Sequence, residues 1–301
     1  MIKRDLRSPA VLFAIPTAIW SSTWLAIKYQ LGTVAPDVSV AYRFALAALL
    51  LGAWCALRRR SLRFDRRTHA FLALQGALMF GFSYVGLYWA ERYATSGLVA
   101  VVFSTIVFMN AISARWMFGS VATPRTLVAA VLGVAGVALL FAPEIAHPLA
   151  GEAGLGLLLA LGATTISSAG NLAAMRNQRA GVPVMTGSAW AMAYGALAAA
   201  GSAMWHGASL RFDTGAPYVA SLVYLAVFGS VVAFGAYLTL LQDVGPARAS
   251  YVGVAAPVGA MLLSTVFEDY RWTVVGACGA ALVLLGNGLV LAQRPSVRGA
   301  A

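Results

Sequence analysis

The sequence predicts an all-α integral membrane protein with ten transmembrane helices, which form two inverted five-helix repeats around a central cavity, with the N and C termini cytoplasmic. Three observations predict this fold class: the scarcity of charge, the apolar runs and the placement of the basic residues. The 301-residue chain is 60% hydrophobic and 10% charged, with a mean hydropathy of +0.79. A soluble domain carries about 25% charged residues, so most of this chain must meet lipid rather than water.

Ten apolar runs have the length that a membrane-spanning helix requires. A helix needs about 20 predominantly apolar residues to cross the hydrocarbon core. The first run is long and has no small-residue cleavage site before it ends, so we expect a retained span rather than a signal peptide. The predicted spans are Ala10–Leu31, Val38–Leu57, Ala70–Ala90, Thr95–Phe118, Arg125–Phe141, Gly154–Ala174, Val184–Trp205, Ala216–Gln242, Ala247–Phe267 and Trp272–Leu291.

The basic residues alternate between the two sides of the predicted membrane. With the N-terminus inside, 16 of the 21 Lys and Arg fall in inside segments, three fall outside and two lie within spans. Cytoplasmic loops are enriched in Lys and Arg, and a wrong helix count would reverse the pattern part-way along the chain. The basic run Arg58–Arg67 could in principle bind nucleic acid. Such a run beside a span is typical of an anchor on anionic lipid, so we expect no nucleic-acid partner.

A weak internal repeat divides the chain into two five-helix halves, residues 1–150 and 151–301. The stretch Gly245–Asp269 opens with a Gly245-Pro246 turn and holds a second proline, Pro257, inside its apolar run, and Ser96–Gly119 is a weaker copy of it at an offset of 151 residues. The spans that follow the two copies align at an offset of 150. Five spans separate the copies, and an odd number of crossings inverts the second copy, as in many secondary transporters.

The chain lacks the sequence signatures of catalysis and of cofactor binding. It has no glycine-rich phosphate loop and only two lysines, which excludes ATP-driven transport within this polypeptide. Its two cysteines and three histidines have no metal-ligand spacing. A membrane-embedded lipid enzyme would need His or carboxylate clusters near one interface, and a scaffold or sensor normally carries a soluble appendage; the sequence contains neither. We therefore expect no enzyme, no cofactor and no metal site.

All ten carboxylates fall at the ends of predicted spans or in loops. Acidic residues within spans usually mark proton relays or cation sites. Their absence from the spans argues against an obligate cation exporter, and it leaves the energy source open, because facilitated efflux needs no coupling residue.

Two cations lie inside predicted spans, Lys28 near the outer end of the first and Arg43 one to two turns into the second. Together they could form an electropositive outer vestibule that attracts a substrate carboxylate. Alternatively, each side chain reaches the headgroups or pairs with Asp37 or Glu91. The sequence leaves both alternatives open.

The candidate cavity linings are polar or aromatic residues inside the spans. Trp20 and Trp24 share one face of the first span, since residues four apart lie on the same side of a helix. A single aromatic residue in a span more often contacts lipid or a neighbouring helix. Amides are costlier to bury, so Asn110, Asn171 and Gln75 should face a wet cavity or bridge helices. The full set is Trp20, Ser21, Trp24, Arg43, Gln75, Met79, Ser83, Tyr84, Tyr88, Phe103, Asn110, Ser168, Asn171, Trp190 and Tyr237, with Pro257 as the candidate hinge.

Four segments together resemble the EamA-type proteins of the drug/metabolite transporter superfamily: AIWSSTWLAIK (Ala18–Lys28), Pro36 followed by Arg43 in PDVSVAYRFALAALLL, Gly245–Asp269, and the Gly276–Gly288 helix. The resemblance covers nearly the whole chain and depends on the order and spacing of these segments. It implies a basket of ten helices made of two inverted repeats, a central substrate cavity, and rocking between outward-open and inward-open states. Within the family, the chain is most similar to bacterial aromatic amino-acid exporters.

Two departures from the family pattern affect the expected mechanism. Family members commonly repeat the proline and the terminal acid in both halves, whereas the first half here has Ile106 and Met117. We therefore expect the ninth helix to be more bent than the fourth. The related small multidrug exporters carry a glutamate in their first helix, and Ala10–Leu31 has no acid, which argues against export of lipophilic cations.

The sequence thus predicts a multi-pass transporter of the bacterial inner membrane that exports small, largely hydrophobic metabolites by alternating access. Aromatic and other apolar amino acids are the expected substrates. The alternative is another metabolite or drug, such as a nucleotide sugar, whose carrier should present more basic residues to the cavity than Arg43 alone. The expected partners are the substrate and the lipid bilayer, and the internal pseudo-symmetry is compatible with a functional monomer.

Overall fold

The computed structural model describes residues 8–107, 109–110, 124–145, 150–244 and 252–291, and every regular element in these ranges is a helix. The helical segments of this part of the chain make up ten rods, and each predicted span overlaps one of them. The Gly245-Pro246 turn and Met117, which entered the repeat alignment, lie outside the described residues.

The first five rods begin at α2. The hydroxyl of Ser8 accepts a hydrogen bond from the Val11 amide at 3.3 Å, and Pro9 occupies the first turn, where a missing N–H costs nothing. The third rod changes from α-helical to π-helical and back. The elements are α2 (Pro9–Lys28), α3 (Pro36–Leu57), the α4–η1–α5 rod (Arg66–Gly76, Ala77–Phe82 and Ser83–Ala90), α6 (Ser96–Ser104) and α8 (Pro124–Ile145).

The second five rods repeat one rare feature of the first five. Their third rod also contains a π-helical segment, and the two segments begin at Ala77 and Leu225, 148 residues apart. Such wide turns are uncommon and often occur at functional sites. The elements are α9 (Ala150–Arg179), α10 (Val184–Trp205), the α11–η2–α12 rod (Ala216–Tyr224, Leu225–Val232 and Ala233–Val244), α14 (Val252–Phe267) and α15 (Val274–Leu291).

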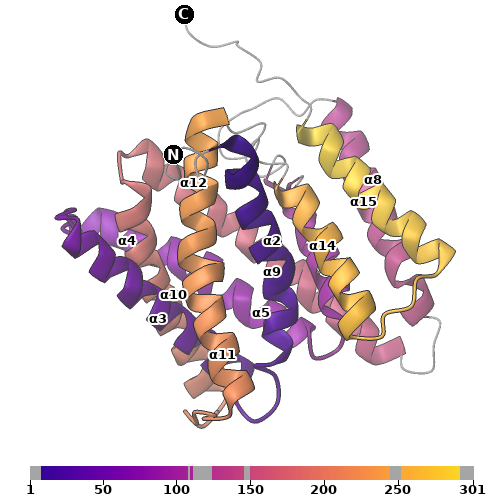
Figure 1. Cartoon of the computed structure of the whole chain (residues 1–301), viewed down its shortest axis with the longest axis horizontal. Helices are drawn as coiled ribbons and strands as arrows, with labels where there is room; N and C mark the ends of the chain where they lie inside the picture. Colours follow the sequence, from indigo (N-terminus) through magenta and orange to yellow (C-terminus); the bar gives the residue numbers. More distant parts are fainter. Residues whose placement is uncertain (1–7, 108, 111–123, 146–149, 245–251, 292–301) are drawn as a thin grey trace, which may run out of the picture.

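Rods at the same position in the two halves pack against each other: α3 against α10, α6 against α14, and α8 against α15. The remaining contacts also correspond, because α2 packs on α12 and α14 while its counterpart α9 packs on α5 and α6. Figure 1 shows α8 and α15 together at one edge of the molecule. The first residues of α2 and the last residues of α15 lie at the same end, as an even number of antiparallel crossings requires.

Glycines allow the closest of these helix contacts. A Cβ on Gly279 of α15 would lie 2.6 Å from the Gly136 carbonyl oxygen of α8, and a Cβ on Gly286 would lie 2.8 Å from the Ala129 carbonyl oxygen. Helices in membranes commonly approach through such small residues. Gly136 and Gly279 thus let α8 and α15 approach closely.

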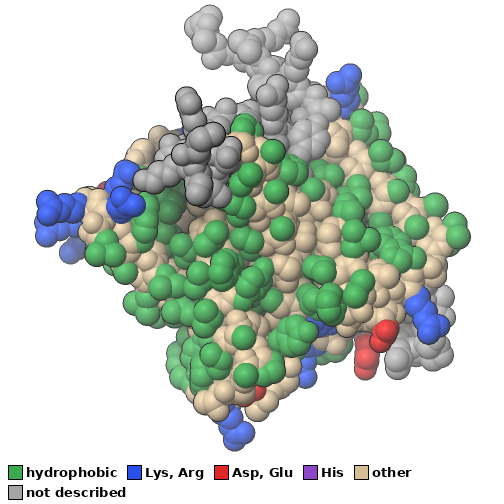
Figure 2. Space-filling view, viewed as in Figure 1, with side chains coloured by type: hydrophobic (Ala, Val, Ile, Leu, Met, Phe, Trp, Pro, Cys, Tyr) green, Lys and Arg blue, Asp and Glu red, His purple; other side chains and the backbone are tan. Residues whose placement is uncertain are grey.

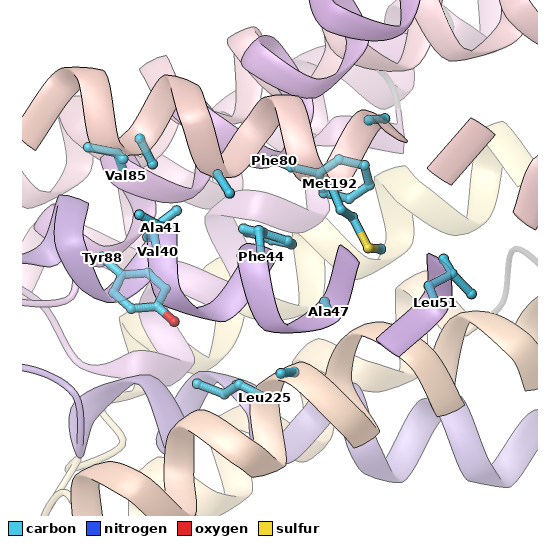
Figure 3. Close-up of a cluster of buried hydrophobic side chains, with 14 of the residues drawn as sticks. Val40, Ala41, Phe44, Ala47, Leu51, Phe80, Val85, Tyr88, Met192 and Leu225 are labelled. Carbon is cyan, nitrogen blue, oxygen red and sulfur yellow. The ribbon is translucent and has the colours of Figure 1, made fainter. Parts of the chain in front are cut away.

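One buried hydrophobic cluster joins the two halves of the chain. Phe44 of α3 packs on Phe80 of η1 and on Tyr84 of α5, with ring centroids 5.1 and 4.8 Å apart. Met192 of α10 and Leu225 of η2 complete the cluster, and Figure 3 shows the α3 side chains lying between those of the other rods. The inner part of α3 is therefore surrounded by protein rather than by lipid.

The outer surface is apolar, as expected for a protein that lies in a bilayer. Figure 2 shows a face covered by hydrophobic side chains, with Lys and Arg gathered towards its edges. Within the described residues, five helices are long and apolar enough to cross a membrane: Pro9–Lys28, Pro36–Leu57, Arg66–Ala90, Glu152–Arg179 and Ala216–Tyr237. Leu127–Ala142, Val252–Phe267 and Val274–Leu289 are shorter apolar helices.

The expectation that the ninth helix is more bent than the fourth stays a prediction, and the backbone interruption lies in the fourth. The α14 helix continues through Pro257, whereas α6 ends at Ser104 and helical backbone resumes at Ile106. The hydroxyls of Ser104 and Thr105 donate to the carbonyl oxygens of Val101 and Val102 at 2.7 and 2.6 Å. Hydroxyl side chains that bond nearby carbonyls compete with the helical ladder and bend it. The fourth helix is therefore the interrupted one.

Candidate substrate-binding site

A chain of aromatic rings crosses the interior from α2 to α3. Trp20 lies 5.4 Å from Tyr237 and 5.3 Å from Phe234, centroid to centroid, and Phe234 lies 6.4 Å from Phe80. Phe80 contacts Phe44, which carries the chain on to Tyr84. The indole N–H of Trp20 donates to the Gly229 carbonyl oxygen at 3.1 Å, which fixes the ring against the π-helical segment η2. The structure thus brings together three of the predicted residues: Trp20, Tyr84 and Tyr237.

Arg43 lies at the end of this aromatic chain and is 3% exposed. Its guanidinium lies over the Tyr84 ring, 4.7 Å from the centroid, and Nη1 donates to the Tyr88 hydroxyl at 3.4 Å. The Tyr88 hydroxyl in turn donates to Oε1 of Gln30 at 2.7 Å. The Nε of Arg43 has no hydrogen-bond partner in the described part of the chain, and no ion pair with a carboxylate is formed there. Aromatic faces thus balance the charge, while one donor is left for a ligand.

A second group of predicted residues lies where the fourth rod meets α2 and α9. Trp24 packs on Phe103 with a centroid separation of 5.4 Å. Nδ2 of Asn171 on α9 donates to Oδ1 of Asn110 at 3.3 Å. Both amides were predicted to face a cavity or to bridge helices, and they form a bridge here. Each is only partly buried, so each can also take part in hydrogen bonds with a solute.

Other predicted residues serve helix contacts away from the aromatic chain. Oε1 of Gln75 accepts a hydrogen bond from Asn177 at 2.9 Å, so Gln75 bridges α4 to α9. Trp190 donates to the Leu62 carbonyl oxygen at 2.9 Å and its ring contacts His69, which places it in a separate aromatic cluster. Sequence spacing shows which residues share one face of a helix. It does not show which residues of different helices line the same cavity.

The remaining predicted residues lie in tight contacts between rods. The Ser21 hydroxyl donates to the Ala256 carbonyl oxygen at 3.0 Å, next to the buried Pro257. Met79 abuts Gly170, where a Cβ would lie 2.8 Å from the Met79 amide nitrogen. Ser83 and Ser168 are buried. Ser21 and Met79 thus lie where two rods meet, and the hinge role of Pro257 stays a prediction.

Sequence reasoning missed an ionic cluster at the end of α2. Nζ of Lys28 donates to the carbonyl oxygens of Glu91 and Ala94, and it lies 3.5 Å from Oε1 of Glu268. The Glu268 carboxylate accepts hydrogen bonds from the Ser96 amide at 3.1 Å, a favourable place for an anion because that amide begins a helix. The partner of Lys28 is thus Glu268 and not the carboxylate of Asp37 or Glu91.

The carboxylates at span ends are also more buried than their positions suggested. Asp37 accepts a hydrogen bond from the Trp89 indole at 2.9 Å, and it is 2% exposed. Glu91 is 0% exposed. A residue at the end of one helix is buried when loops and the ends of other helices cover it. The sequence of that helix does not show which segments do so. The pattern of one span could not have identified these side chains.

Two hollows on the described surface lie outside the predicted set. One of about 340 Å³ lies between α2 and α11 and is lined by Ser22, Tyr29, Pro217 and Tyr224 among others. The other, of about 470 Å³, follows α15 from Ala281 to Leu289. Both linings are mainly apolar and face outward. In this conformation the rings of the aromatic chain contact one another across the interior.

Apolar rods surrounding an aromatic and cationic interior define a multi-pass membrane protein of the transporter class. The chain belongs to the EamA-like transporter family, whose model matches residues 7–142 and 154–292. It is a multi-pass transporter of the inner membrane, and the family is one of transporters rather than of enzymes.

Similar proteins cover nearly the whole chain. The chain is 30% identical over 288 residues to the uncharacterized inner membrane transporter YedA of Escherichia coli K12, with 93% of this chain and 90% of that protein covered. It is 27% identical over 299 residues to the uncharacterized transporter YvbV of Bacillus subtilis, with coverage of 97% and 94%. A solved crystal structure aligns with a TM-score of 0.65 and 21% identity over 94% of this chain and 96% of that one, which shows a shared fold alone.

Proposed function

We propose that this transporter exports small apolar metabolites that carry a carboxylate, most simply aromatic and other apolar amino acids, by alternating access. The observation that carries the proposal is Arg43, a buried guanidinium with a free donor at the end of a chain of aromatic rings. A carboxylate and a guanidinium form strong, charge-assisted hydrogen bonds. A ring in the substrate could meanwhile replace one of the ring contacts of the protein, because aromatic pairs of many geometries are favourable.

The arrangement of the rods supports alternating access between two inverted halves. Counterpart rods make corresponding contacts, and each half holds one π-helical segment in its third rod. The family model likewise matches two stretches of similar length, residues 7–142 and 154–292. Transporters built from inverted repeats bind substrate near the midplane between the repeats. The aromatic chain, which joins α2 and α3 of the first half to η2 and α12 of the second, lies between the proposed halves.

We assign this conformation to an occluded or closed stage of the cycle, because the rings of the aromatic chain contact one another across the interior. Ring contacts such as Trp20 with Phe234 and Phe44 with Tyr84 occupy the space that a substrate ring would need. A substrate must therefore enter when the two halves have moved apart. This is the population shift that alternating access requires, in which the ligand favours the state that has room for it.

The direct test is efflux of labelled phenylalanine, tryptophan or threonine from proteoliposomes that contain the purified protein. We expect the two aromatic amino acids to leave at a rate well above that from protein-free vesicles. Phenethylamine keeps the ring of phenylalanine and lacks the carboxylate, so an excess of it should compete poorly. Strong competition by the amine would contradict the role of Arg43, and no efflux of any amino acid would favour another class of metabolite.

Substitution of Arg43 by Lys tests the proposed carboxylate contact. Lysine keeps the charge but loses the planar fork that binds a carboxylate with two hydrogen bonds. We expect phenylalanine efflux to fall about tenfold or more, equivalent to about 1.4 kcal/mol. The matched control is Arg211→Lys, because Arg211 is exposed in a loop and should leave efflux unchanged. Equal efflux by Arg43→Lys and the wild type would remove Arg43 from the site.

A further inference from the structure

Glu91 is a buried carboxyl that takes no part in the proposed binding of the substrate. It directly follows the last residue of α5 and is 0% exposed. Neither of its carboxylate oxygens has a hydrogen-bond partner among the described residues. An ionised carboxylate that is buried without hydrogen bonds is very costly, so this conformation favours the neutral, protonated form.

Charged groups from three other rods act on Glu91. Lys28 at the end of α2, Glu268 after the end of α14 and Arg43 on α3 are the charged neighbours, and Tyr88 precedes it on its own rod. Burial raises the pKa of the Glu91 carboxyl well above its usual range, against the opposing charges of Lys28 and Arg43. The neighbouring Arg92 is exposed and stacks on Trp89, 5.0 Å from its ring centroid.

The same end of the molecule is held closed by the ionic cluster around Lys28. Lys28 joins the end of α2 to the main chain at Glu91 and Ala94 and to the carboxylate of Glu268. Glu268 then binds the first amide of α6, at Ser96. These contacts tie α2, α6 and α14 to the loop that carries Glu91. If they separate, Glu91 is uncovered.

We propose that Glu91 is the proton-binding site of the transport cycle, and that it takes a proton from the outer aqueous phase when the outer end of the transporter closes. The inference rests on the proposed function and on the predicted topology, in which this end faces outward. The proton comes from external water and returns to external water when the outer end opens again and the carboxyl ionises. Because the proton enters and leaves on the same side, external pH controls the return step without driving transport, which is compatible with facilitated efflux.

The direction in which external pH shifts the conformation follows from the two environments of the Glu91 carboxyl. Protonation favours the closed conformation, in which the neutral group is buried, and ionisation favours a conformation in which it meets water. Each unit by which the pKa differs between the two conformations shifts their equilibrium by about tenfold. Acid outside should therefore close the outer end of the empty transporter and return it to the inward-facing state, which accelerates net export.

The test compares net efflux with exchange in right-side-out membrane vesicles loaded with labelled phenylalanine at a fixed internal pH. Net efflux requires the return of the empty transporter, whereas exchange with external unlabelled phenylalanine does not. For the wild type we expect net efflux to rise several-fold as the external buffer is made acidic, with little change in exchange. In Glu91→Gln, which is neutral at every pH, the ratio of net efflux at the two external pH values should fall to about one.

The control variant is Glu152→Gln, because Glu152 is an exposed carboxylate on the first turn of α9. It should keep the wild-type response to external pH. A full response in Glu91→Gln would overturn the proposal, as would a wild-type response to internal pH alone. Absence of phenylalanine exchange in the wild type would instead contradict the proposed function, so the two failures are distinguishable.

A direct measurement guards against loss of folding in the variant. Infrared difference spectra of the wild-type protein between acidic and alkaline buffer should contain the band of a protonated carboxyl group. The same band should be absent from Glu91→Gln and present in Glu152→Gln. A band that persists in Glu91→Gln would assign the proton to another group and overturn the proposal.

Discussion

At the scale of the residue, the proposed function depends on polar side chains in places where lipid or protein surrounds them. The sequence identified Arg43, Asn110 and Asn171 because charged and amide groups are rare within spans and costly to bury. It could not identify Gln30 or Glu91, since both lie at helix ends and become buried only through contacts with other rods. Residue type and depth along a span can be read from sequence, whereas the neighbours across the interior cannot.

We predict that Asn171→Leu abolishes phenylalanine efflux while the amount of protein in the membrane is retained. The substitution removes the hydrogen bond to Asn110, which is 3.3 Å long. Leucine and asparagine differ little in size, so the packing of α9 should change little. Transport assays in proteoliposomes and a blot of the membrane fraction provide the measurement. Gln178→Leu is the control, because Gln178 is an exposed amide on the same helix. Unchanged efflux in Asn171→Leu would remove this residue from the site.

At the scale of the element, the sequence shows the size of each residue on a helix, whereas the interruptions of the helix and its neighbours become visible only in the structure. The small size of Gly136 and Gly279 lets α8 and α15 pack closely, and residue size is read directly from the sequence. The interruption of the fourth helix was not predicted, since the proline of the ninth helix was weighted above two hydroxyl side chains. Ser104 and Thr105 bond the carbonyl oxygens of their own helix, and Asn287 of α15 donates to the Ser104 hydroxyl at 2.9 Å, which stabilises the interruption.

The α8–α15 contact gives a stability prediction. In Gly279→Ala the new Cβ would lie 2.5 Å from the Leu140 amide nitrogen and 2.6 Å from the Gly136 carbonyl oxygen, so the helices must separate. Overpacking of this kind costs about 1–3 kcal/mol. Thermal unfolding of the purified protein in detergent should show a lower midpoint.

The matched control for that contact is Gly288→Ala on the same helix, where a Cβ meets nothing within 4 Å. It should keep or raise the midpoint, because alanine favours a helix over glycine by about 0.5–1 kcal/mol. Equal midpoints for the two variants would mean that α8 and α15 do not make this contact in the membrane protein.

At the scale of the whole molecule, composition and periodicity were sufficient for the all-helical membrane fold and for ten rods. The fold class and the number of helices depend on many residues at once, so an error of a few residues at one helix end does not alter them. The packing partners of the rods and the ring contacts across the interior were beyond sequence, since they depend on which apolar face meets which. The inverted topology stays a prediction, and its test also belongs to this scale.

Chemical labelling can test the orientation of the two ends. In a background with Cys55 and Cys278 replaced by serine, Arg63→Cys and Arg211→Cys each place one thiol at an exposed loop position. A membrane-impermeant maleimide added to intact cells should label the cysteine at position 211, and should label that at position 63 only after permeabilisation. Labelling of both in intact cells would contradict the alternation of the loops.

The two π-helical segments have a geometric consequence for the rods that contain them. A wide turn holds one residue more than an α-helical turn, so it sets the rotational phase of everything that follows. If the residues of Ala77–Phe82 formed an ordinary α-helix instead, the remainder of the rod would be rotated by about 100°, because one residue corresponds to 1/3.6 of a turn. Tyr84 and Tyr88 would then face away from Arg43. The extra residue in each half therefore works as a phase adjustment, which aligns the two ends of one rod with different neighbours.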